Sequence, residues 1–211
     1  MKSRKLSRKE NQEVTREELL SAAHDCFVRH GYQGSSVDRI AERAGFSKGA
    51  FYSNFNSKAS ILLEFLARHH AKYIAQLRDI IHRATADEMS AALGEWDALR
   101  NVEPEWAGLN IELLMHARSD AKFQAQYVDY VQRYRRALAE LLTKRFKKAR
   151  RTPPAPAEDL AATLIAVADG LALQRYLTGS SGPEITGTML GMISDGWIAI
   201  ASRAPSDHQI S

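Results

Sequence analysis

The sequence lacks several features on which whole classes of protein depend. Cys26 is the one cysteine among 211 residues, which excludes an internal disulfide framework and any metal site built from several cysteines. No run approaches the ~18 uninterrupted apolar residues of a membrane span, and the charged residues 1–10 lead into no apolar signal core. The composition therefore predicts a cytoplasmic protein with no membrane partner.

Residues that could support catalysis or bind metal are poorly arranged. Glu112 and His116 are one residue further apart than the Glu-x-x-His pair of di-iron bundles, and they form a single such pair. His69 and His70 are adjacent, so they cannot chelate a metal from one helix face in the i, i+4 manner. Cys26 falls on the apolar face of a predicted helix, which is typical of a packing thiol. We therefore expect no catalytic site, no metal and no cofactor.

Strands are not indicated either. No segment alternates apolar and polar residues with period two, whereas apolar residues recur at helical spacing through most of the chain. A basic, proline-rich segment, residues 150–156, must interrupt the helical pattern. The fold class is therefore predicted to be all-α. The long helices are expected at 58–81, 86–99, about 104–118, 121–148, 157–178 and 183–202.

Positive charge is concentrated in the first part of the chain. Residues 1–60 contain 11 Lys+Arg against 7 Asp+Glu and so carry all of the formal net charge of +4, while residues 61–211 are balanced. This pattern favours a polyanionic partner for the first part, although a solvated tail explains it equally well. We expect a basic flexible arm over 1–14, a DNA-binding domain over 15–60 and a helical C-terminal domain over 61–211.

The segment from 15 to 60 carries a recognisable arrangement of short helices. Thr15 and Glu18 have the spacing of a capping box, and Gly31 is placed to end that first helix. Two shorter helices are then expected over 37–44 and 48–55, with a sharp turn at Gly45. Two helices of this length joined by a glycine-containing turn are typical of a helix-turn-helix.

The second of these helices presents an outward face suited to DNA. Small residues at its N-terminus allow its backbone to approach the floor of the major groove. Tyr52 can contact a phosphate or a thymine methyl, and the polar residues that follow can bond base edges. The alternative is that the same two-helix arrangement serves a domain that binds no DNA. The expected DNA contacts are Ser36, Ser47, Lys48, Gly49, Ala50, Tyr52, Ser53, Asn54 and Lys58.

The segment from 15 to 65 resembles the DNA-binding domain of the TetR (tetracycline-repressor) family of bacterial regulators. The resemblance rests on LLSAAHDCFVRHGYQGSSV, on IAERAGFSKGAFYSNFNSK and on the long helix that begins at Lys58. It implies a homodimer, usually a repressor, that leaves double-stranded operator DNA when a small molecule binds the C-terminal domain. It also assigns the nine residues above to DNA contact. Ala59 and Ser60 stand where the family often has an acidic residue.

Two further sites are expected within 61–211. The last two helices are more apolar than a small domain needs to bury, which favours a dimer interface over a monomer core. An effector pocket would combine aromatic walls with a few polar groups. The interface residues are predicted to be Leu164, Val167, Leu171, Met189, Met192, Ile193 and Trp197. The pocket residues are predicted to be Trp96, Trp106, Asn110, Met115, His116, Tyr127, Tyr130 and Gln174.

Two alternatives stay open at this point. A protein partner, or nothing at all, could control a regulator of the same fold, with the C-terminal domain serving only to dimerise. The basic residues at the end of the helix over 121–148 could extend a DNA footprint, but cations at a helix C-terminus are more simply explained as solvated groups that favour the helix dipole. These residues are Arg145, Lys147, Lys148, Arg150 and Arg151.

Overall fold

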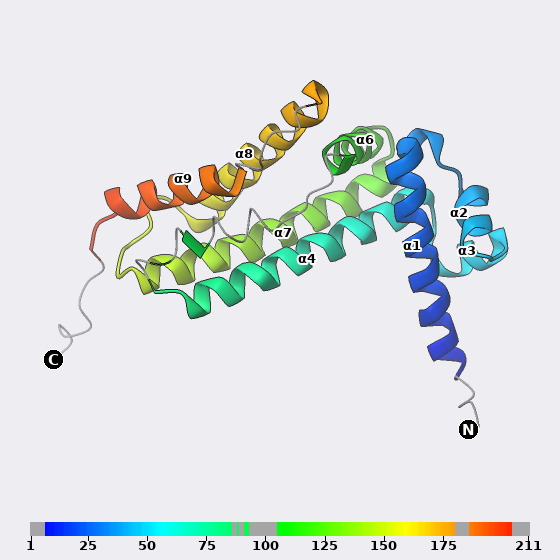
Figure 1. Cartoon of the computed structure of the whole chain (residues 1–211), viewed down its shortest axis with the longest axis horizontal. Coiled ribbons are helices and arrows are strands. Elements are labelled where there is room, and N and C mark those ends of the chain that lie inside the picture. Colours follow the sequence, from blue (N-terminus) through cyan, green and yellow to red (C-terminus); the bar gives the residue numbers. More distant parts are fainter. Residues whose placement is uncertain (1–6, 86–87, 89–90, 93–104, 180–185, 204–211) are drawn as a thin grey trace. The chain divides into compact units, whose positions relative to one another are not determined.

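The computed structural model describes residues 7–85, 88, 91–92, 105–179 and 186–203, and most of these residues are helical (Figure 1). Apart from an isolated bridge between Arg151 and Arg203, the described residues contain no β-structure. The all-α fold class expected from the sequence is confirmed. The helices are α1 (Arg8–Gly34), α2 (Val37–Arg43), α3 (Lys48–Asn54), α4 (Lys58–Arg83), α6 (Glu105–Ser119), α7 (Ala121–Lys148), α8 (Ala157–Thr178) and α9 (Thr186–Ile200).

The chain divides into two compact units that are not single stretches of sequence. The first comprises residues 1–69 and 108–128, and the second comprises residues 70–107 and 129–211. The unit limits fall inside α4, α6 and α7, so these helices contribute residues to both units. The domain limits expected from the sequence ignore this interleaving, and they remain predictions.

The first helix begins earlier than the sequence suggested. The Ser7 hydroxyl accepts a hydrogen bond from the Glu10 N–H at 3.2 Å, and the Glu10 carboxylate accepts one from the Ser7 N–H at 2.7 Å. This reciprocal pair of hydrogen bonds is a capping box, and its N-cap residue, Ser7, directly precedes α1. The prediction of a cap at Thr15 was therefore wrong, and residues 8–14, expected as part of a flexible arm, are helical. No glycine or proline lies between Ser7 and Thr15 to stop the helix from extending.

The remaining helix limits match the sequence pattern closely. The predicted helices over 121–148 and 157–178 are found with those bounds as α7 and α8. The Ser36 hydroxyl caps α2 by accepting from the Arg39 N–H at 3.1 Å, and the Ser47 hydroxyl caps α3 by accepting from the Ala50 N–H at 3.2 Å. The helix expected over 86–99 lies mostly outside the described residues.

In the first unit, α2 and α3 pack against α1 to form a small core. Leu19, Ala23 and Phe27 of α1 are at most 1% exposed, as are Ile40 of α2 and Phe51 of α3. Each short helix therefore contributes one large side chain that is completely buried. Neither helix could bury its apolar face alone, so the core depends on α1 and on the first turns of α4.

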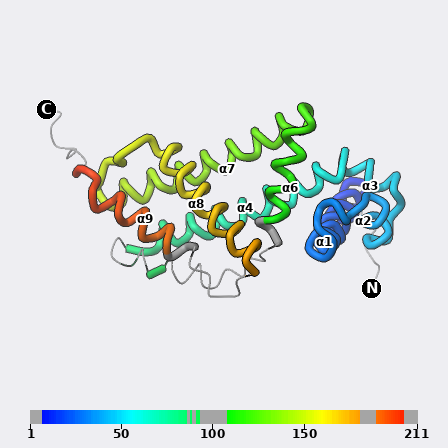
Figure 2. Tube along the Cα trace, turned by 90° about the horizontal axis from the view of Figure 1, so that it is seen from above, coloured from blue at the N-terminus to red at the C-terminus, as the bar shows by residue number. Residues whose placement is uncertain are grey.

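In the second unit, the later parts of α4 and α7 run side by side, and α8 and α9 lie next to each other (Figures 1 and 2). One core cluster joins α4 and α7 through Ile74, Ile81 and Leu141. A second cluster joins α7 and α8 around Phe146 and Leu164, with α9 side chains packed against it. The two clusters leave a space between the four helices, which is described below.

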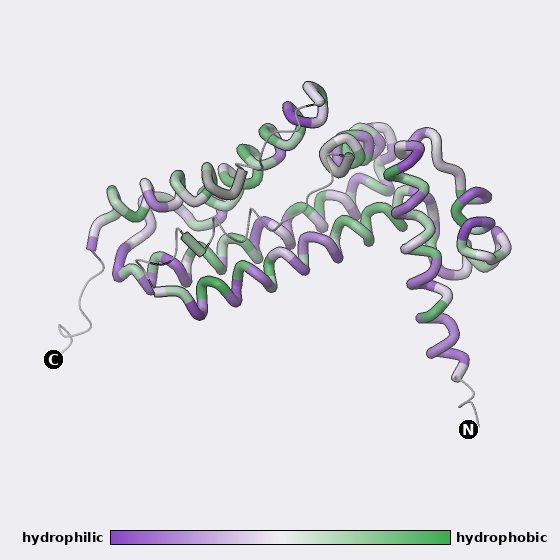
Figure 3. The backbone as a smooth tube through the Cα atoms, viewed as in Figure 1, coloured by the Kyte–Doolittle hydropathy of each residue, from purple (hydrophilic) through white to green (hydrophobic). Residues whose placement is uncertain are grey.

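Helices α8 and α9 are rich in hydrophobic residues (Figure 3). Leu177, Met192 and Ile200 expose 72%, 59% and 75% of their surface. Of the described helices, α8 is the one long and apolar enough to cross a membrane by length and composition, and 17% of its most apolar window is buried. Exposed apolar surface of this extent on neighbouring helices is typical of a protein interface.

Candidate nucleic-acid interface and effector cavity

The helix-turn-helix is held by serine caps and by one glycine. Gly45, in the turn between α2 and α3, has φ +75°, a backbone conformation that side chains with a Cβ disfavour. The Phe46 N–H donates to the Ala41 carbonyl at 2.9 Å and closes the turn. Phe51 then fixes α3 against the core, which sets the direction in which the opposite face of α3 points.

Four of the nine residues predicted to contact DNA are exposed on α3. Tyr52 is 51% exposed, and Gly49 and Ser53 are exposed with it. The Lys48 ammonium is exposed and lies 3.0 Å from the Asp38 carboxylate, which raises the pKa of Lys48 and keeps it protonated. A polar, partly cationic helix face anchored from behind by one aromatic residue is suited to enter a major groove.

Two of the predicted DNA contacts point inward instead. The Asn54 side-chain amide donates to the Ala50 carbonyl at 2.9 Å, and its Oδ1 is buried. The Lys58 ammonium donates to the carbonyls of Tyr32 and Ser35, the second at 2.8 Å, and lies 4.0 Å from the centre of the Tyr32 ring. In this conformation Lys58 fixes the loop between α1 and α2, and either residue would have to rotate outward to touch DNA.

Helix α6 contacts the end of α1 within the first unit. The Glu112 carboxylate accepts a hydrogen bond from the Gln33 N–H at 3.1 Å, next to the kink in α1 at Gly31, where φ is +67°. The ring of His116 lies 5.9 Å from that of Tyr32. Burial, together with the carboxylates of Glu112 and Asp120, raises the pKa of the Tyr32 hydroxyl to about 12. Sequence reasoning missed this contact because the residues are about eighty positions apart and form no motif.

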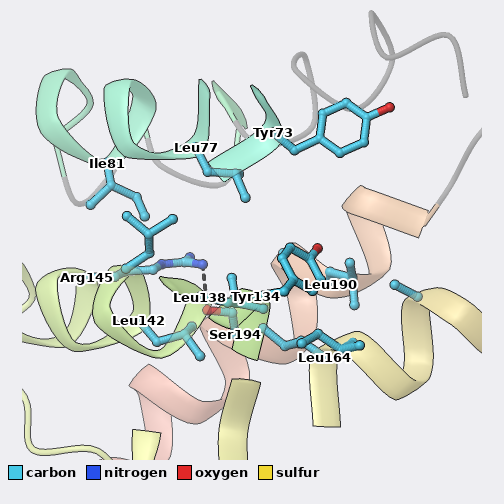
Figure 4. Close-up of a pocket in the computed structure, with 14 residues that line it drawn as sticks. Tyr73, Leu77, Ile81, Tyr134, Leu138, Leu142, Arg145, Leu164, Leu190 and Ser194 are labelled. Atoms are coloured by element: carbon cyan, nitrogen blue, oxygen red, sulfur yellow. Dashed lines mark hydrogen bonds between the residues drawn. The ribbon is translucent and has the colours of Figure 1, made fainter. Parts of the chain in front are cut away.

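A cavity of roughly 110 Å³ lies between α4, α7, α8 and α9 in the second unit (Figure 4). Its walls are mainly leucine and isoleucine side chains, with tyrosines from α4 and α7 and one buried charged group, Arg145. The lining residues are Tyr73, Leu77, Ile81, Tyr134, Leu138, Leu141, Leu142, Arg145, Leu164, Ile165, Ala168, Leu190, Gly191 and Ser194. An apolar space with a few convergent polar groups is the usual form of a small-molecule site.

The basic cluster at the end of α7 is not uniformly solvated, which corrects one expectation. Arg145 is 5% exposed and pairs with Ser194 and Asp195 of α9. The Lys148 ammonium donates to the carbonyls of Ile81 and His82 at 3.0 and 3.1 Å, so it caps the C-terminal end of α4 rather than that of its own helix. A run of cations does not reveal which of its members faces a neighbouring helix.

None of the predicted pocket residues whose side chains the structure describes lines the cavity. Tyr130 is buried, with its hydroxyl 2.7 Å from the Nδ1 of His70. Asn110 has a buried Oδ1, Met115 is 55% exposed, and Gln174 is exposed. Tyr127 is half-buried. Trp96 and the side chain of Trp106 lie outside the described residues. The prediction favoured aromatic residues around α6, whereas the cavity is mostly aliphatic.

The predicted dimer residues are distributed over both sides of α8 and α9. Leu164 is buried in the core and lines the cavity, and Ile193 and Trp197 pack against the same cluster. Met189 and Met192 are exposed, while Val167 and Leu171 are half-buried. An outward apolar surface and an inward one therefore exist on the same pair of helices, and the sequence pattern did not separate them.

Within the part of the chain that the structure describes, no group of three or more His, Cys, Asp or Glu side chains could hold a metal ion. Cys26 is buried, and burial raises the pKa of its thiol. A thiol in this state is a poor nucleophile.

Comparison with family models identifies both parts of the chain. Residues 19–65 match "Bacterial regulatory proteins, tetR family", and residues 85–186 match "BetI-type transcriptional repressor, C-terminal". The HTH-type transcriptional repressor AcnR of Corynebacterium glutamicum is 29% identical over 167 residues, which cover 79% of this chain and 84% of that protein. The activator FasR of Mycolicibacterium smegmatis is 39% identical over 70 residues, about a third of each chain (33% and 32%).

Solved structures share the fold. A transcriptional regulator from Rhodococcus has a TM-score of 0.66 and 23% identity, over 90% of this chain and 99% of its own. A regulator from Saccharomonospora viridis in complex with choline has a TM-score of 0.62 and 24% identity, over 90% and 100%. FadR from Bacillus subtilis in complex with stearoyl-CoA has a TM-score of 0.62 and 19% identity, over 87% and 96%.

Proposed function

Since the chain belongs to the TetR family of bacterial regulatory proteins, we propose that it is a transcriptional repressor that a small-molecule effector releases from a palindromic operator. One observation carries the proposal: α3 exposes Tyr52, Lys48 and Ser53 on one face while Phe51 anchors the other. Exposed polar residues on a helix fixed from behind are what major-groove reading requires. Its site of action would be the cytoplasm, where the operator DNA is.

The apolar outer surface of α8 and α9 supports a homodimer. Leu177, Met192 and Ile200 are largely exposed in the single chain, and a second copy is the partner that a two-fold repressor needs. Such a dimer would place two copies of α3 roughly 34–36 Å apart, in successive major grooves of one operator. Burial of α8 in this dimer interface would also explain why the helix is so apolar, and no membrane is needed to explain it.

Control by the effector would be a shift between two conformations. A ligand that binds one conformation better, while DNA binds the other better, lowers the affinity for DNA by thermodynamic linkage. Helix α4 is suited to this role because one continuous helix carries Lys58 at the DNA-binding end and Tyr73, Leu77 and Ile81 at the cavity. The hydrogen bond between Glu112 and the Gln33 N–H also connects α6 directly to α1.

A small-molecule effector is favoured over the two alternatives, a protein partner or constitutive activity. The cavity of the second unit supports this choice, because a domain that only dimerises has no need of an apolar space between four helices. The similar regulators whose structures contain choline or stearoyl-CoA show that this fold accommodates ligands of very different size. The identity of the ligand does not transfer from those proteins.

The first test is binding of the purified protein to the intergenic DNA beside its own gene, with Tyr52→Ala as the control variant. Phosphate contacts predict that the affinity falls steeply with salt, and base reading predicts that random DNA binds ~10³-fold or more weakly. Tyr52→Ala leaves the core intact, because Tyr52 is half exposed. Equal, weak binding of the unmodified protein to both DNAs would contradict the proposal for that operator.

A further inference from the structure

Arg145 is the only charged side chain among the described residues that line the cavity of the second unit. It extends from α7 into the space between Leu77 and Ile81 of α4 and Ser194 of α9 (Figure 4). The side chain is 5% exposed, and burial lowers its pKa, although Asp195 partly opposes that shift. A buried arginine in a mostly aliphatic space requires hydrogen-bond acceptors for its donors.

Two of the three guanidinium nitrogens have partners. One terminal nitrogen donates to the Ser194 hydroxyl at 2.5 Å, and the other donates to the Asp195 carboxylate. The Nε–H is buried and has no hydrogen-bond partner among the described residues. An unsatisfied buried donor destabilises a protein unless something supplies an oxygen. Because Arg145 lines the cavity, a ligand that carries an acceptor is a candidate to supply that oxygen.

The charge of Arg145 disfavours a ligand whose polar end is a cation. Asp195 already balances Arg145, so the pair offers no excess negative charge to an ammonium group. The cavity lining contains no other carboxylate among the described residues. A cationic head would therefore meet the guanidinium without a counter-ion, whereas a carbonyl or carboxylate oxygen would accept from the Nε–H.

The size of the cavity limits the rest of the molecule. One water requires roughly 10–15 Å³ of cavity volume, so 110 Å³ corresponds to on the order of seven to eleven non-hydrogen atoms. The leucine and isoleucine walls require that almost all of these atoms be apolar.

We propose that the effector is an apolar molecule of about this size that ends in a carbonyl or carboxylate oxygen, and that this oxygen accepts a hydrogen bond from the Nε–H of Arg145. Its role as effector rests on the proposed function, whereas its binding to the cavity does not. The shared chemistry is the acceptor oxygen, and the experiment below distinguishes a neutral head from a charged one.

Three probes of matched length test the head group on the unmodified protein: 2-octanone, octanoate and octylamine. We expect 2-octanone, octanoate or both to raise the Tm by about 3 °C at ten times their dissociation constant, and octylamine to bind at least ~10-fold more weakly than the better of the two. The order of 2-octanone and octanoate then identifies the head as neutral or charged. Equal or tighter binding of octylamine, or no binding by any probe, would overturn the proposal.

Arg145→Lys tests the donor itself. Lysine retains a cation for Asp195 but has no Nε–H, so the preference for 2-octanone over octylamine should fall at least ~5-fold. If Arg145 only connects α7 to α9, the affinities for both probes fall together and the ratio is unchanged. Should the variant not fold, the Arg145 Nε–H resonance of the ¹⁵N-labelled unmodified protein serves instead: it must shift with 2-octanone or octanoate, and an unchanged resonance at saturation would refute the contact.

Gly191→Leu tests whether the probes occupy this cavity. Gly191 lines the cavity, and a Cβ at that position meets no heavy atom within 4 Å, so the larger side chain fills the space without a backbone clash. Binding of each probe should be lost while the fold is retained, and unchanged binding would locate the probes elsewhere.

A DNA titration in the presence of the bound probe separates the two proposals. Probe binding that depends on Arg145 but leaves DNA affinity unchanged would support the ligand chemistry and contradict the effector mechanism. Release of DNA by octylamine through the cavity would support the mechanism and refute the ligand chemistry.

Discussion

Arg16 provides a quantitative test of how the recognition helix is held. Its guanidinium donates to the Asn54 carbonyl at the end of α3 and to the Glu64 carboxylate of α4, and it lies 4.2 Å from the centre of the Phe55 ring. The side chain of Arg16 is 29% exposed and that of Glu64 is 25% exposed. One residue of α1 therefore connects the end of α3 to α4.

Arg16→Met retains the aliphatic part of the side chain and removes all three interactions. A hydrogen bond from a charged donor contributes about 1.5–3 kcal/mol, a cation–π contact about 0.5–1 kcal/mol and a partly exposed ion pair at most about 1 kcal/mol. Because such contributions are not additive, we expect a loss of about 2–4 kcal/mol in the free energy of unfolding. Urea denaturation at one fixed protein concentration measures it, since the stability of a dimer depends on concentration.

Arg68→Met is the matched control. Arg68 pairs with Glu64 as well, and with Glu17, but its side chain is 45% exposed and it has no contact with α3 among the described residues. Its loss should cost about 0–1 kcal/mol. If the two variants destabilise the protein equally, to within about 0.5 kcal/mol, then the contact with Asn54 contributes nothing and the reasoning is wrong.

Two further predictions concern the turn before the recognition helix and the contact at the α1 kink. Gly45→Ala forces a Cβ at φ +75°, so it should cost about 1 kcal/mol or more in urea denaturation and lower operator affinity in the same protein; an unchanged midpoint would refute the strain. Glu112→Gln removes the negative charge of the group that accepts from the Gln33 N–H. It should reduce the effect of the effector on DNA affinity more than it changes DNA affinity without effector. DNA titrations with and without effector measure both quantities, and equal changes in the two would show that α6 plays no part.

Local signals were sufficient to predict α2 and α3, whereas the DNA contacts assigned to α3 stay predictions. Ser36, Gly45 and Ser47 act through neighbours within three or four residues, so their positions fixed α2 and α3 before any tertiary contact was known. Lys58 shows the limit of this reasoning. Its place after α3 suggested a phosphate contact, but its ammonium is directed at the carbonyls of Tyr32 and Ser35, and no periodicity encodes that choice.

The cavity could not be predicted because it depends on how helices meet. Periodicity identifies the apolar face of each helix, but it does not say which apolar residues touch and which leave a space between them. Arg145 lies in a run of cations that resembles a solvated helix end, and only its contacts with Ser194 and Asp195 reveal that it is buried. Aromatic content, the signal used for the predicted pocket, does not identify a space with mostly aliphatic walls, and the predicted pocket stays a prediction.

The anchoring of α3 has a consequence for how such proteins diversify. Phe51 holds the helix from behind, and the serine caps lie before each helix begins, so the exposed positions around Tyr52 and Ser53 contribute little to folding. After a gene duplication, these positions could change and acquire a new target sequence while the protein remained folded. Selection on target choice and selection on stability would then act on separate residues of a seven-residue helix.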